Sequence, residues 1–529
     1  MVKNVVIVGG GTAGWLAAAY LARTLAIQAP QGARITLIES ADIGILGVGE
    51  GTFPSIRNTL QRIGIDEAAF LRGSNATFKQ GIRFNHWQVA PGDAGRDHYF
   101  HPFQSAQVRG ELDLLPYWLQ GHAEPGLEWD EAVTLQKAVS DAALGPKRPQ
   151  DGPYGGPFSY AYHFDAVRFA ALLRDAAISL GVRLIVDTVD KVEQAETGDI
   201  TGVVTRENGT VTGDFFIDCS GFRAALIGKT LGEPFVSCKD SLFCDRAVAM
   251  QVPYDRPDAP IASYTISTAQ KAGWTWDIGL DARRGIGHVY SSSHMDDEAA
   301  EKILRGYIGP ASDDVAPRSF KFDVGYRKRS WVGNCVAVGL ASGFFEPLEA
   351  TGIVFIEVAA ILIANLFPWA GEMETAARQF NRIMGERYRT SADFLKLHYC
   401  LSRRRDSAFW RDNADPASWS DSLKELLDRW RTRPPDGMDF DMNCQNFSEA
   451  SWQFVLYGMG FKTDLSARAG TFSRHDQARA KFAEIRRHAE QAVKAMPGHR
   501  ALVEHLYKHG FQPPQANPFL NAAGAVRIG

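Results

Sequence analysis

The segment Asn4-Val-Val-Ile-Val8, followed at once by Gly9-Gly-Gly-Thr-Ala-Gly14, decides the fold of this chain. The first five residues form a largely apolar run, which is typical of a parallel strand buried on both faces. An alanine-rich segment, Trp15 to Ala26, comes next and has good helical propensity. We therefore expect a strand, a tight glycine turn and a helix in succession, which is how a dinucleotide-binding fold begins.

The glycines of this turn have separate roles in such a site. Gly9 permits the tight turn, Gly11 lets the backbone approach a pyrophosphate, and Gly14 lets the helix pack close to the strand. The unpaired N–H groups at the helix N-terminus, near Thr12 and Ala13, then face the phosphates. All five residues are expected to belong to the cofactor site.

A second strand is expected at Arg34–Glu39, with Glu39 at its end, where it can bind a ribose hydroxyl. Strand, helix and terminal acid appear in order, which favours a nucleotide site over a glycine turn without a ligand. Two later segments, 215–221 and 335–341, each read as a buried strand opening into a glycine turn. These segments favour FAD over NAD, and the lack of a second GxGxxG suggests that electrons arrive from outside the chain.

Bulk composition excludes several classes of function. The chain has 529 residues, with 57 basic and 61 acidic side chains and a net charge near −4, which argues against nucleic acid or an anionic membrane as partner. No apolar run is long enough to cross a bilayer, so we expect a cytoplasmic protein. The six cysteines show no metal-ligand spacing and read as reduced thiols. His505 and His509 have metal-ligand spacing but no convincing third ligand, so no metal site is expected.

The pattern of elements indicates a mixed α/β protein. Strand-like and helix-like segments alternate up to about residue 390, and residues 240–325 read as a second, antiparallel sheet over the cofactor module. We expect residues 1–390 to form an FAD-binding module with an interleaved substrate-side sheet at about 85–130 and 240–325. Residues 391–529 are expected to form a mainly helical region that completes the substrate pocket.

Seven separate segments of the chain carry a resemblance to a known family. They are Gly9–Gly14, Gly47–Thr52, Phe78–Gly81, Tyr162–Asp165, Trp274–Ile278, Pro347–Ile353 and Ser451–Leu456. With these motifs the chain resembles the flavin-dependent halogenases of the tryptophan-halogenase type over most of its length. The resemblance implies an FAD-binding fold of the aromatic-hydroxylase type with a helical substrate-binding section.

The resemblance also implies a reaction. FADH2 from a separate flavin reductase, O2 and a halide (bromide or chloride) would yield hypohalous acid, which travels through an internal tunnel to Lys79 and then to an electron-rich aromatic substrate. A lysine ammonium can hydrogen-bond the oxygen of that acid, whereas a neutral amine could form a haloamine; burial would lower the lysine pKa and make either state conceivable. Glu349 matches the base that takes the ring proton. Glu346, in the same motif, is the nearest competitor and the weaker choice by register.

The remaining site residues are also implied by the resemblance. Thr351 and Gly352 fall where the family binds halide through backbone N–H groups, and Ala350 stands where many relatives carry serine. Trp274 and Trp276 are expected to shield the flavin, although two core tryptophans on one face of a strand would have the same spacing. Further cofactor and substrate positions are expected as follows: Gly49, Val189, Gly339 and Gly352 against FAD, and His101, Phe103 and Trp452 around the substrate ring, the last two being equally compatible with ordinary core aromatics.

The substrate expectation depends on one difference from tryptophan-specific members. Those members grip the amino-acid end of tryptophan with a Tyr-Tyr pair and a Glu, whereas 440–449 here has no tyrosine pair. We therefore predict indole, or another electron-rich aromatic without the amino-acid group. Two alternatives remain open: a flavin-dependent aromatic hydroxylase and a non-catalytic flavin-binding sensor. A homodimer is possible.

Overall fold

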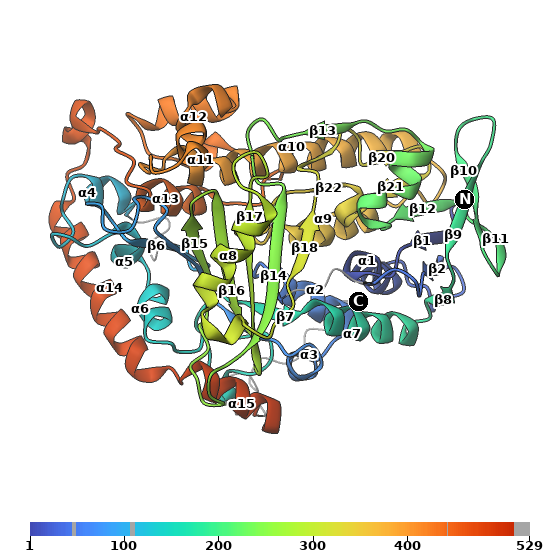
Figure 1. Ribbon diagram of the computed structural model, residues 1–529, viewed down its shortest axis with the longest axis horizontal. Coiled ribbons are helices and arrows are strands. Elements are labelled where there is room, and N and C mark those ends of the chain that lie inside the picture. The colour runs from blue at the N-terminus through green and yellow to red at the C-terminus, as the bar shows by residue number, and fades with distance from the viewer. Residues whose placement is uncertain (45–48, 106–111, 442, 513–529) are drawn as a thin grey trace, which may run out of the picture.

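The computed structural model describes residues 1–44, 49–105, 112–441 and 443–512. Gly47, Val48 and Met442, which belong to segments used above, lie outside the described residues. The structure is a mixed α/β fold in which two large sheets lie side by side and helices cover one end (Figure 1). The predicted fold class is confirmed.

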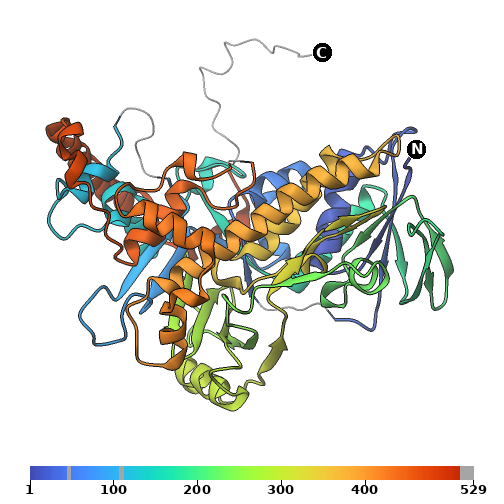
Figure 2. The same ribbon diagram turned by 90° about the horizontal axis from the view of Figure 1, so that it is seen from above.

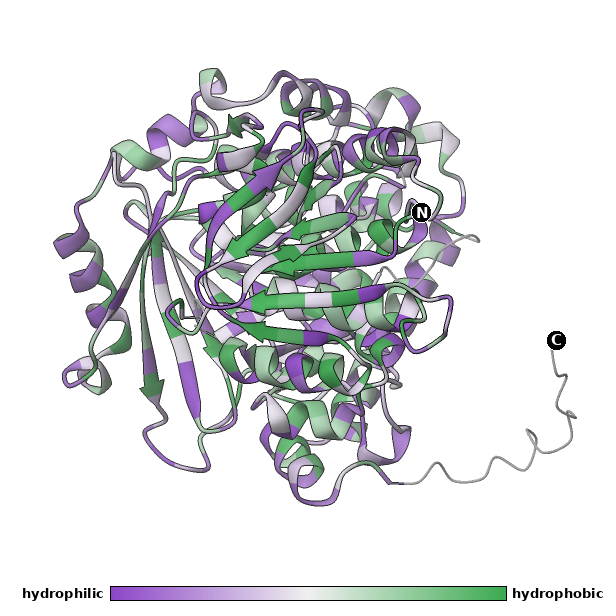
Figure 3. Ribbon diagram, turned by 90° about the vertical axis from the view of Figure 1, so that its right-hand side faces the viewer, coloured by the Kyte–Doolittle hydropathy of each residue, from purple (hydrophilic) through white to green (hydrophobic). Residues whose placement is uncertain are grey.

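The first sheet has six strands in the order β20-β21-β12-β1-β2-β8. Its strands are β1 (Asn4–Val8), β2 (Arg34–Glu39), β8 (Arg183–Val186), β12 (Phe215–Asp218), β20 (Trp331–Val332) and β21 (Cys335–Ala337). Strand β1 runs parallel to β2 and β12, and only β20 pairs antiparallel. The strands are coloured mostly as hydrophobic in Figure 3, as expected for a sheet with both faces covered.

Helix α1 (Thr12–Thr24) follows β1 directly and contacts α7 (Ala166–Ser179) and α9 (Thr351–Asn365). The glycine turn makes this packing possible, since a Cβ on Gly14 would lie 1.8 Å from the Gly9 carbonyl oxygen. Gly9 has φ +115°, where other residues are strained. The predicted strand–turn–helix is therefore confirmed.

The second sheet has seven strands in the order β18-β14-β17-β16-β15-β5-β6. Its strands are β5 (Gly81–Asn85), β6 (His98–Pro102), β14 (Arg246–Pro253), β15 (Thr265–Gln270), β16 (Gly273–Gly279), β17 (Arg283–Tyr290) and β18 (Arg318–Lys321). Within residues 240–325 every strand pairing is antiparallel, as expected, and β5, from outside that range, joins the sheet by pairing in parallel with β15. No hairpin joins these two strands, so the local turn signals that reveal β15 to β17 do not report on this pairing.

The expected interleaving of the N-terminal part is narrower than residues 85–130. Only β6 and the end of β5 enter the sheet, and α4 (Leu115–Leu119) and α5 (Trp129–Val133) follow. The boundary expected at residue 390 falls within α10 (Met373–Cys400), a continuous helix that contacts both β20 and the C-terminal helices (Figure 2). These helices are α11 (Ala408–Ala414), α12 (Asp421–Trp430), α13 (Glu449–Gly458), α14 (His475–Ala495) and α15 (His499–His509).

A small sheet lies between the two large ones and is formed by β3 (Gly49–Gly51), β7 (Ala161–Asp165) and β4 (Thr77–Lys79). A single hydrophobic core cluster includes residues from both large sheets and from the C-terminal helices. Among the described residues, no helix has the length and apolar character that a bilayer-spanning segment needs.

Candidate active site

A cavity of about 610 Å³ opens at the carboxyl ends of β1, β2 and β12. This is the edge of a parallel sheet where nucleotides bind. Its lining contains most residues expected at the cofactor and halide: Gly9, Gly11, Thr12, Ala13, Glu39, Gly49, Val189, Gly339, Thr351 and Gly352. Gly14 is not among the lining residues, because it contacts the Gly9 carbonyl behind the turn.

The residues present fit a dinucleotide. A Cβ on Gly11 would meet no protein atom within 4 Å, so the backbone there faces open space, as contact with a pyrophosphate requires. Gly10 lies against the Glu39 side chain, which places that carboxylate beside the turn. Helix α1 begins at Thr12, so its first N–H groups open onto the same space.

A second helix N-terminus reaches this cavity. Helix α9 begins at Thr351, and Thr351 and Gly352 both line the cavity. Ala350, which precedes the helix, adopts a left-handed conformation with φ 56°. The first amides of α9 therefore form a second place suited to an anion, at the position predicted for halide.

Lys79 is fully buried at the end of β4 and also lines the cavity. Its Nζ has no hydrogen-bond partner among the described residues and lies 5.3 Å from the centre of the Phe103 ring. Burial lowers the pKa of Lys79 to about 8, although the Glu349 carboxylate acts in the opposite direction. A buried ammonium without a partner is costly, so this group is poised to bind an incoming acceptor.

The backbone that carries Lys79 is fixed from the far end of the chain. The Phe78 N–H donates to Nε2 of His499, at 3.0 Å, and Nδ1 of His499 lies 3.0 Å from the Ile261 carbonyl oxygen. Since that carbonyl accepts, Nδ1 carries the hydrogen and Nε2 is free to accept. Helix α15 thus holds β4 in place, a role that sequence reasoning did not assign.

Glu349 is 1% exposed and ends the short 3₁₀ turn Pro347–Glu349. Its Oε1 accepts from His101 Nδ1 and from His398 Nε2, each at 3.0 Å, and Oε2 lies 3.1 Å from His101 Nδ1. Burial alone would raise the pKa of Glu349, but the two imidazoles outweigh burial and lower it to about 2. Glu349 is therefore held ionised, as a proton acceptor must be.

Both His101 and His398 bind the carboxylate of Glu349, a role that the sequence did not predict for either. His101 was predicted to stack on the substrate, yet its Nδ1 binds the carboxylate of Glu349. His398 lies on α10 and was not predicted at all. No local motif marks it, because its role arises only where α10 crosses the 3₁₀ turn.

The two tryptophans of β16 lie in different places. Trp276 lines the cavity, as expected of a residue that shields the flavin, whereas Trp274 is not among the lining residues. Trp274 Nε1 instead donates to Oε2 of Glu346, at 2.9 Å. Burial raises the pKa of Glu346, so the two carboxyl groups of the motif have opposite character.

An aromatic cluster extends from Phe103, the ring that lies beside Lys79. Phe103 packs near Phe53, at 6.5 Å between ring centres, and Phe53 contacts Phe447 at 5.4 Å. Phe447 stacks on Phe394 at 3.8 Å. Sequence reasoning missed Phe53, Phe394 and Phe447, since single phenylalanines far apart in sequence give no signal of proximity.

Trp452 joins this cluster from α13. Its ring contacts Phe394 edge-on at 4.9 Å and stacks on Phe440 at 5.1 Å, with 23° between the planes. Phe394 in turn lies 5.9 Å from His101, so one ring connects the two expected substrate residues. One face of Trp452 is thus covered by protein.

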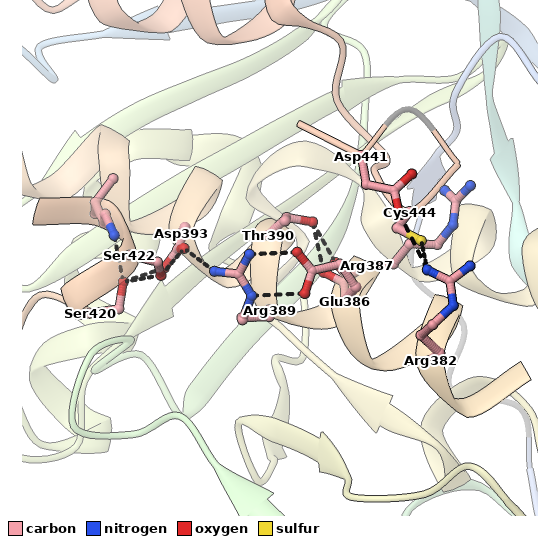
Figure 4. A network of polar contacts seen from close by, with 11 residues as sticks. Arg382, Glu386, Arg387, Arg389, Thr390, Asp393, Ser420, Ser422, Asp441 and Cys444 are labelled. Carbon is pink, nitrogen blue, oxygen red and sulfur yellow. Dashed lines mark hydrogen bonds and ion pairs between the residues drawn. The ribbon is translucent and has the colours of Figure 1, made fainter. Parts of the chain in front are cut away.

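The segment that precedes Phe447 is held to α10 by two arginines, of which Arg382 contacts Asp441 and Cys444 (Figure 4). Arg387 donates to the carbonyl oxygens of Gln445 and Asn443, at 2.6 and 3.0 Å, and to Asn446 Oδ1 at 2.6 Å. Farther along α10, Asp393 accepts from Ser420 and Ser422, which fixes the start of α12. Helix α10 therefore positions His398 and also the loops around the aromatic cluster.

A dinucleotide cavity, a buried ammonium that no described residue hydrogen-bonds, and an ionised glutamate together are the arrangement expected of a flavin-dependent halogenase. A family model described as tryptophan halogenase matches residues 4–472. Tryptophan 6-halogenase SttH of Streptomyces toxytricini is 36% identical over 516 residues, covering 93% of this chain and 96% of that protein.

Solved structures agree. The tryptophan halogenase from Shewanella frigidimarina has a TM-score of 0.92 at 40% identity, covering 97% of this chain and 99% of that one. BrvH, a flavin-dependent halogenase from Brevundimonas sp., has a TM-score of 0.84 at 32% identity, covering 96% and 99%. The chain belongs to the tryptophan halogenase family, and it is a flavin-dependent halogenase.

Proposed function

We propose that this enzyme halogenates indole or a related electron-rich aromatic that lacks an amino-acid group, with Lys79 and Glu349 as the catalytic pair. One observation carries the proposal: the Lys79 ammonium is buried in the cavity wall with no hydrogen-bond partner in the described part of the chain, and the Glu349 carboxylate acts to raise its pKa. The two side chains come from distant parts of the chain. Nucleotide binding requires neither the burial of Lys79 nor its interaction with Glu349.

The glycine turn, with Gly9, Gly11 and Glu39, would hold FAD, and the amides of Thr351 and Gly352 would hold the halide. Reduced FAD, delivered by a separate flavin reductase, would supply the electrons that reduce one oxygen atom of O2 to water while the other joins the halide as hypohalous acid. Trp276 lines the cavity wall and keeps organic substrate away from the cofactor.

Lys79 then binds and orients the hypohalous acid, and Glu349 removes the proton from the ring. The Lys79 ammonium donates a hydrogen bond to the oxygen of the hypohalous acid and makes the halogen more electrophilic. The ring's π electrons form the carbon–halogen bond, the oxygen–halogen bond breaks, and the oxygen leaves as water after taking a proton. Glu349 accepts the proton lost from the same ring carbon, whose C–H electrons restore aromaticity.

The aromatic cluster supports a flat apolar substrate. Phe103 lies beside Lys79, Phe53 packs on Phe103, and Phe447 packs on Phe53; aromatic pairs of this kind contribute roughly 0.5–1.5 kcal/mol each. The segment between Phe440 and Phe447 packs its own phenylalanines onto Trp452 and Phe394. Phenylalanines in this segment, with no tyrosine pair, favour bare indole over the charged end of tryptophan.

The test is mass spectrometry of indole incubated with the protein, a flavin reductase, NADH, O2 and bromide. The expected product carries one bromine in place of one hydrogen, and kcat/KM for indole exceeds that for tryptophan. Lys79→Met serves as the control and should give no product. Hydroxylated product, or rapid flavin reduction by NADPH without the reductase, would instead identify an aromatic hydroxylase.

A further inference from the structure

The hydrogen-bond partners of His398 constrain its protonation. Nδ1 lies 3.0 Å from the carbonyl oxygen of Phe394, one helical turn earlier, and Nε2 lies 3.0 Å from Oε1 of Glu349. A carbonyl oxygen can only accept, so Nδ1 carries a hydrogen. If Nε2 carried none, its lone pair would face a carboxylate oxygen that also only accepts. The contact therefore requires one additional proton between His398 and Glu349.

The surroundings favour that proton on His398. Glu349 also contacts His101, which offers a hydrogen to both carboxylate oxygens, so the carboxylate form is the better satisfied one. Among the described residues, the aromatic rings in contact with His398 are those of Phe84, Trp87, Phe394 and Tyr99, the last on β6. Burial raises the pKa of Tyr99 well above its usual value, so this phenol stays neutral, and Glu349 is the one anion in contact with His398 among the described residues.

We propose that His398 is a positioning residue that pairs with Glu349 as an imidazolium, and that this ion pair fixes the carboxylate for proton abstraction. Oε1 receives both imidazoles, whereas Oε2 receives only His101 among the described contacts. Oε2 thus keeps a lone pair for the ring proton. When Glu349 takes that proton, the buried Glu349–His398 pair carries a net positive charge next to Lys79. This charge favours rapid release of the proton. The role rests on the proposed function of Glu349 as base.

His288 provides an internal comparison in the same protein. It is buried on β17, and its Nδ1 lies 3.2 Å from the Trp274 carbonyl oxygen, but its Nε2 has no partner among the described residues. Burial lowers the pKa of His288 to about 4. The two histidines share the carbonyl contact and differ in the carboxylate, so His288 is expected to be neutral where His398 is charged.

The first test does not depend on halogenase activity. Nitrogen-15 NMR of histidine-labelled protein at pH 7.5, assigned with His398→Gln and His288→Gln, should show both ring nitrogens of His398 protonated and His288 neutral. In Glu349→Gln the anion is absent, and His398 should become neutral with the hydrogen on Nδ1. A neutral His398 in the wild-type protein, or an imidazolium that persists in Glu349→Gln, overturns the proposal whatever the enzyme's substrate is.

The second test measures the consequence for turnover. His398→Phe removes the donor and should lower kcat roughly ten- to a hundredfold with KM for the aromatic substrate within twofold, the size expected when a reacting group is misplaced. His398→Gln keeps a neutral donor, so it should recover part of that loss. In both variants the acid limb of the pH profile should move to higher pH, since Glu349 is then easier to protonate. An unchanged acid limb would show that His398 only fills space.

Discussion

Trp274 Nε1 donates a hydrogen bond to Oε2 of Glu346, at 2.9 Å, deep in the protein. This contact gives Glu346, which directly precedes the Pro347–Ile353 motif, a different environment from that of Glu349 within the motif. Glu346 accepts a hydrogen bond from the Trp274 side chain and has a pKa raised by burial. Glu349, in contrast, contacts two imidazoles and stays ionised. The register argument that preferred Glu349 as the base thus acquires a physical reason.

We predict that Glu346→Gln retains halogenase activity within a few-fold of the wild type, because glutamine can still accept from Trp274. Glu349→Gln should lower kcat by roughly 10²- to 10⁴-fold, the usual contribution of a general base. Steady-state kinetics with indole and bromide measure both effects. A larger loss in Glu346→Gln than in Glu349→Gln would exchange their roles.

Removing the buried charge of Lys79 should stabilise the protein while it abolishes turnover. Burial lowers the pKa of Lys79 from 10.5 to about 8, so the unfolded chain binds this proton more tightly than the folded protein does. At pH 7 the free energy of unfolding of Lys79→Met should exceed that of the wild type by about 3 kcal/mol. Urea denaturation at pH 7 and pH 10 measures this difference, which should shrink as pH rises because wild-type Lys79 then becomes neutral.

Lys137 is the matched control for that experiment. It is also buried, but the carboxylates of Asp130 and Asp141 outweigh the effect of burial and raise its pKa. Lys137→Met should therefore destabilise the protein, the opposite sign to Lys79→Met. Equal destabilisation in both variants would mean that Lys79 has a satisfied partner, contrary to the geometry described above.

The same pKa predicts an alkaline limit for activity. The ammonium of Lys79 is lost as pH rises through about 8, while Glu349 remains ionised, so turnover should fall above that pH. Hypohalous acid also titrates at alkaline pH, so the rate profile alone does not assign the limb. Burial also lowers the pKa of Lys396 to about 8, so carbon-13 NMR of lysine-labelled protein should show side chains that titrate near pH 8, one of which is missing from Lys79→Met. If no such signal disappears in Lys79→Met, the assignment is refuted.

Sequence reasoning succeeded where the signal is local. The β1–α1 turn, Glu39 at the end of β2 and the register that singles out Glu349 are all encoded within a few residues. The turn and Glu39 line one cavity, and so do Leu348 and Ala350, the neighbours of Glu349 in the chain. It failed where contacts depend on segments remote in the chain. The parallel pairing of β5 with β15, and the meeting of His398 with Glu349, arise from tertiary packing that no periodicity reports.

The glycine turn allows cofactor binding to be separated from folding. A Cβ on Gly11 would meet no protein atom, and its φ of −76° suits alanine, so Gly11→Ala should keep the wild-type Tm. The added methyl would nevertheless occupy the space needed by the pyrophosphate and should weaken FAD binding at least tenfold, equivalent to about 1.4 kcal/mol. Fluorescence titration with FAD measures the affinity.

Gly14→Ala is the contrasting variant, because its Cβ would lie 1.8 Å from the Gly9 carbonyl oxygen and should force α1 away from the sheet. This variant should lose stability first, with a lower Tm in the absence of FAD. If Gly11→Ala bound FAD normally, the cofactor would have to lie elsewhere in the cavity.

Arg387 offers a last test, of the aromatic cluster. Its three hydrogen bonds hold residues 443–446 against α10, and Phe447, the next residue, stacks on Phe394. Arg387→Met should release this segment and cost binding of a flat substrate about 1.4 kcal/mol, a tenfold rise in KM, with kcat nearly unchanged. Arg378→Met, which removes an exposed pair with Glu374 on the same helix, is the control and should leave KM unaltered. A drop in kcat without a change in KM would mean that the segment positions Glu349 or Lys79 and does not form the substrate wall.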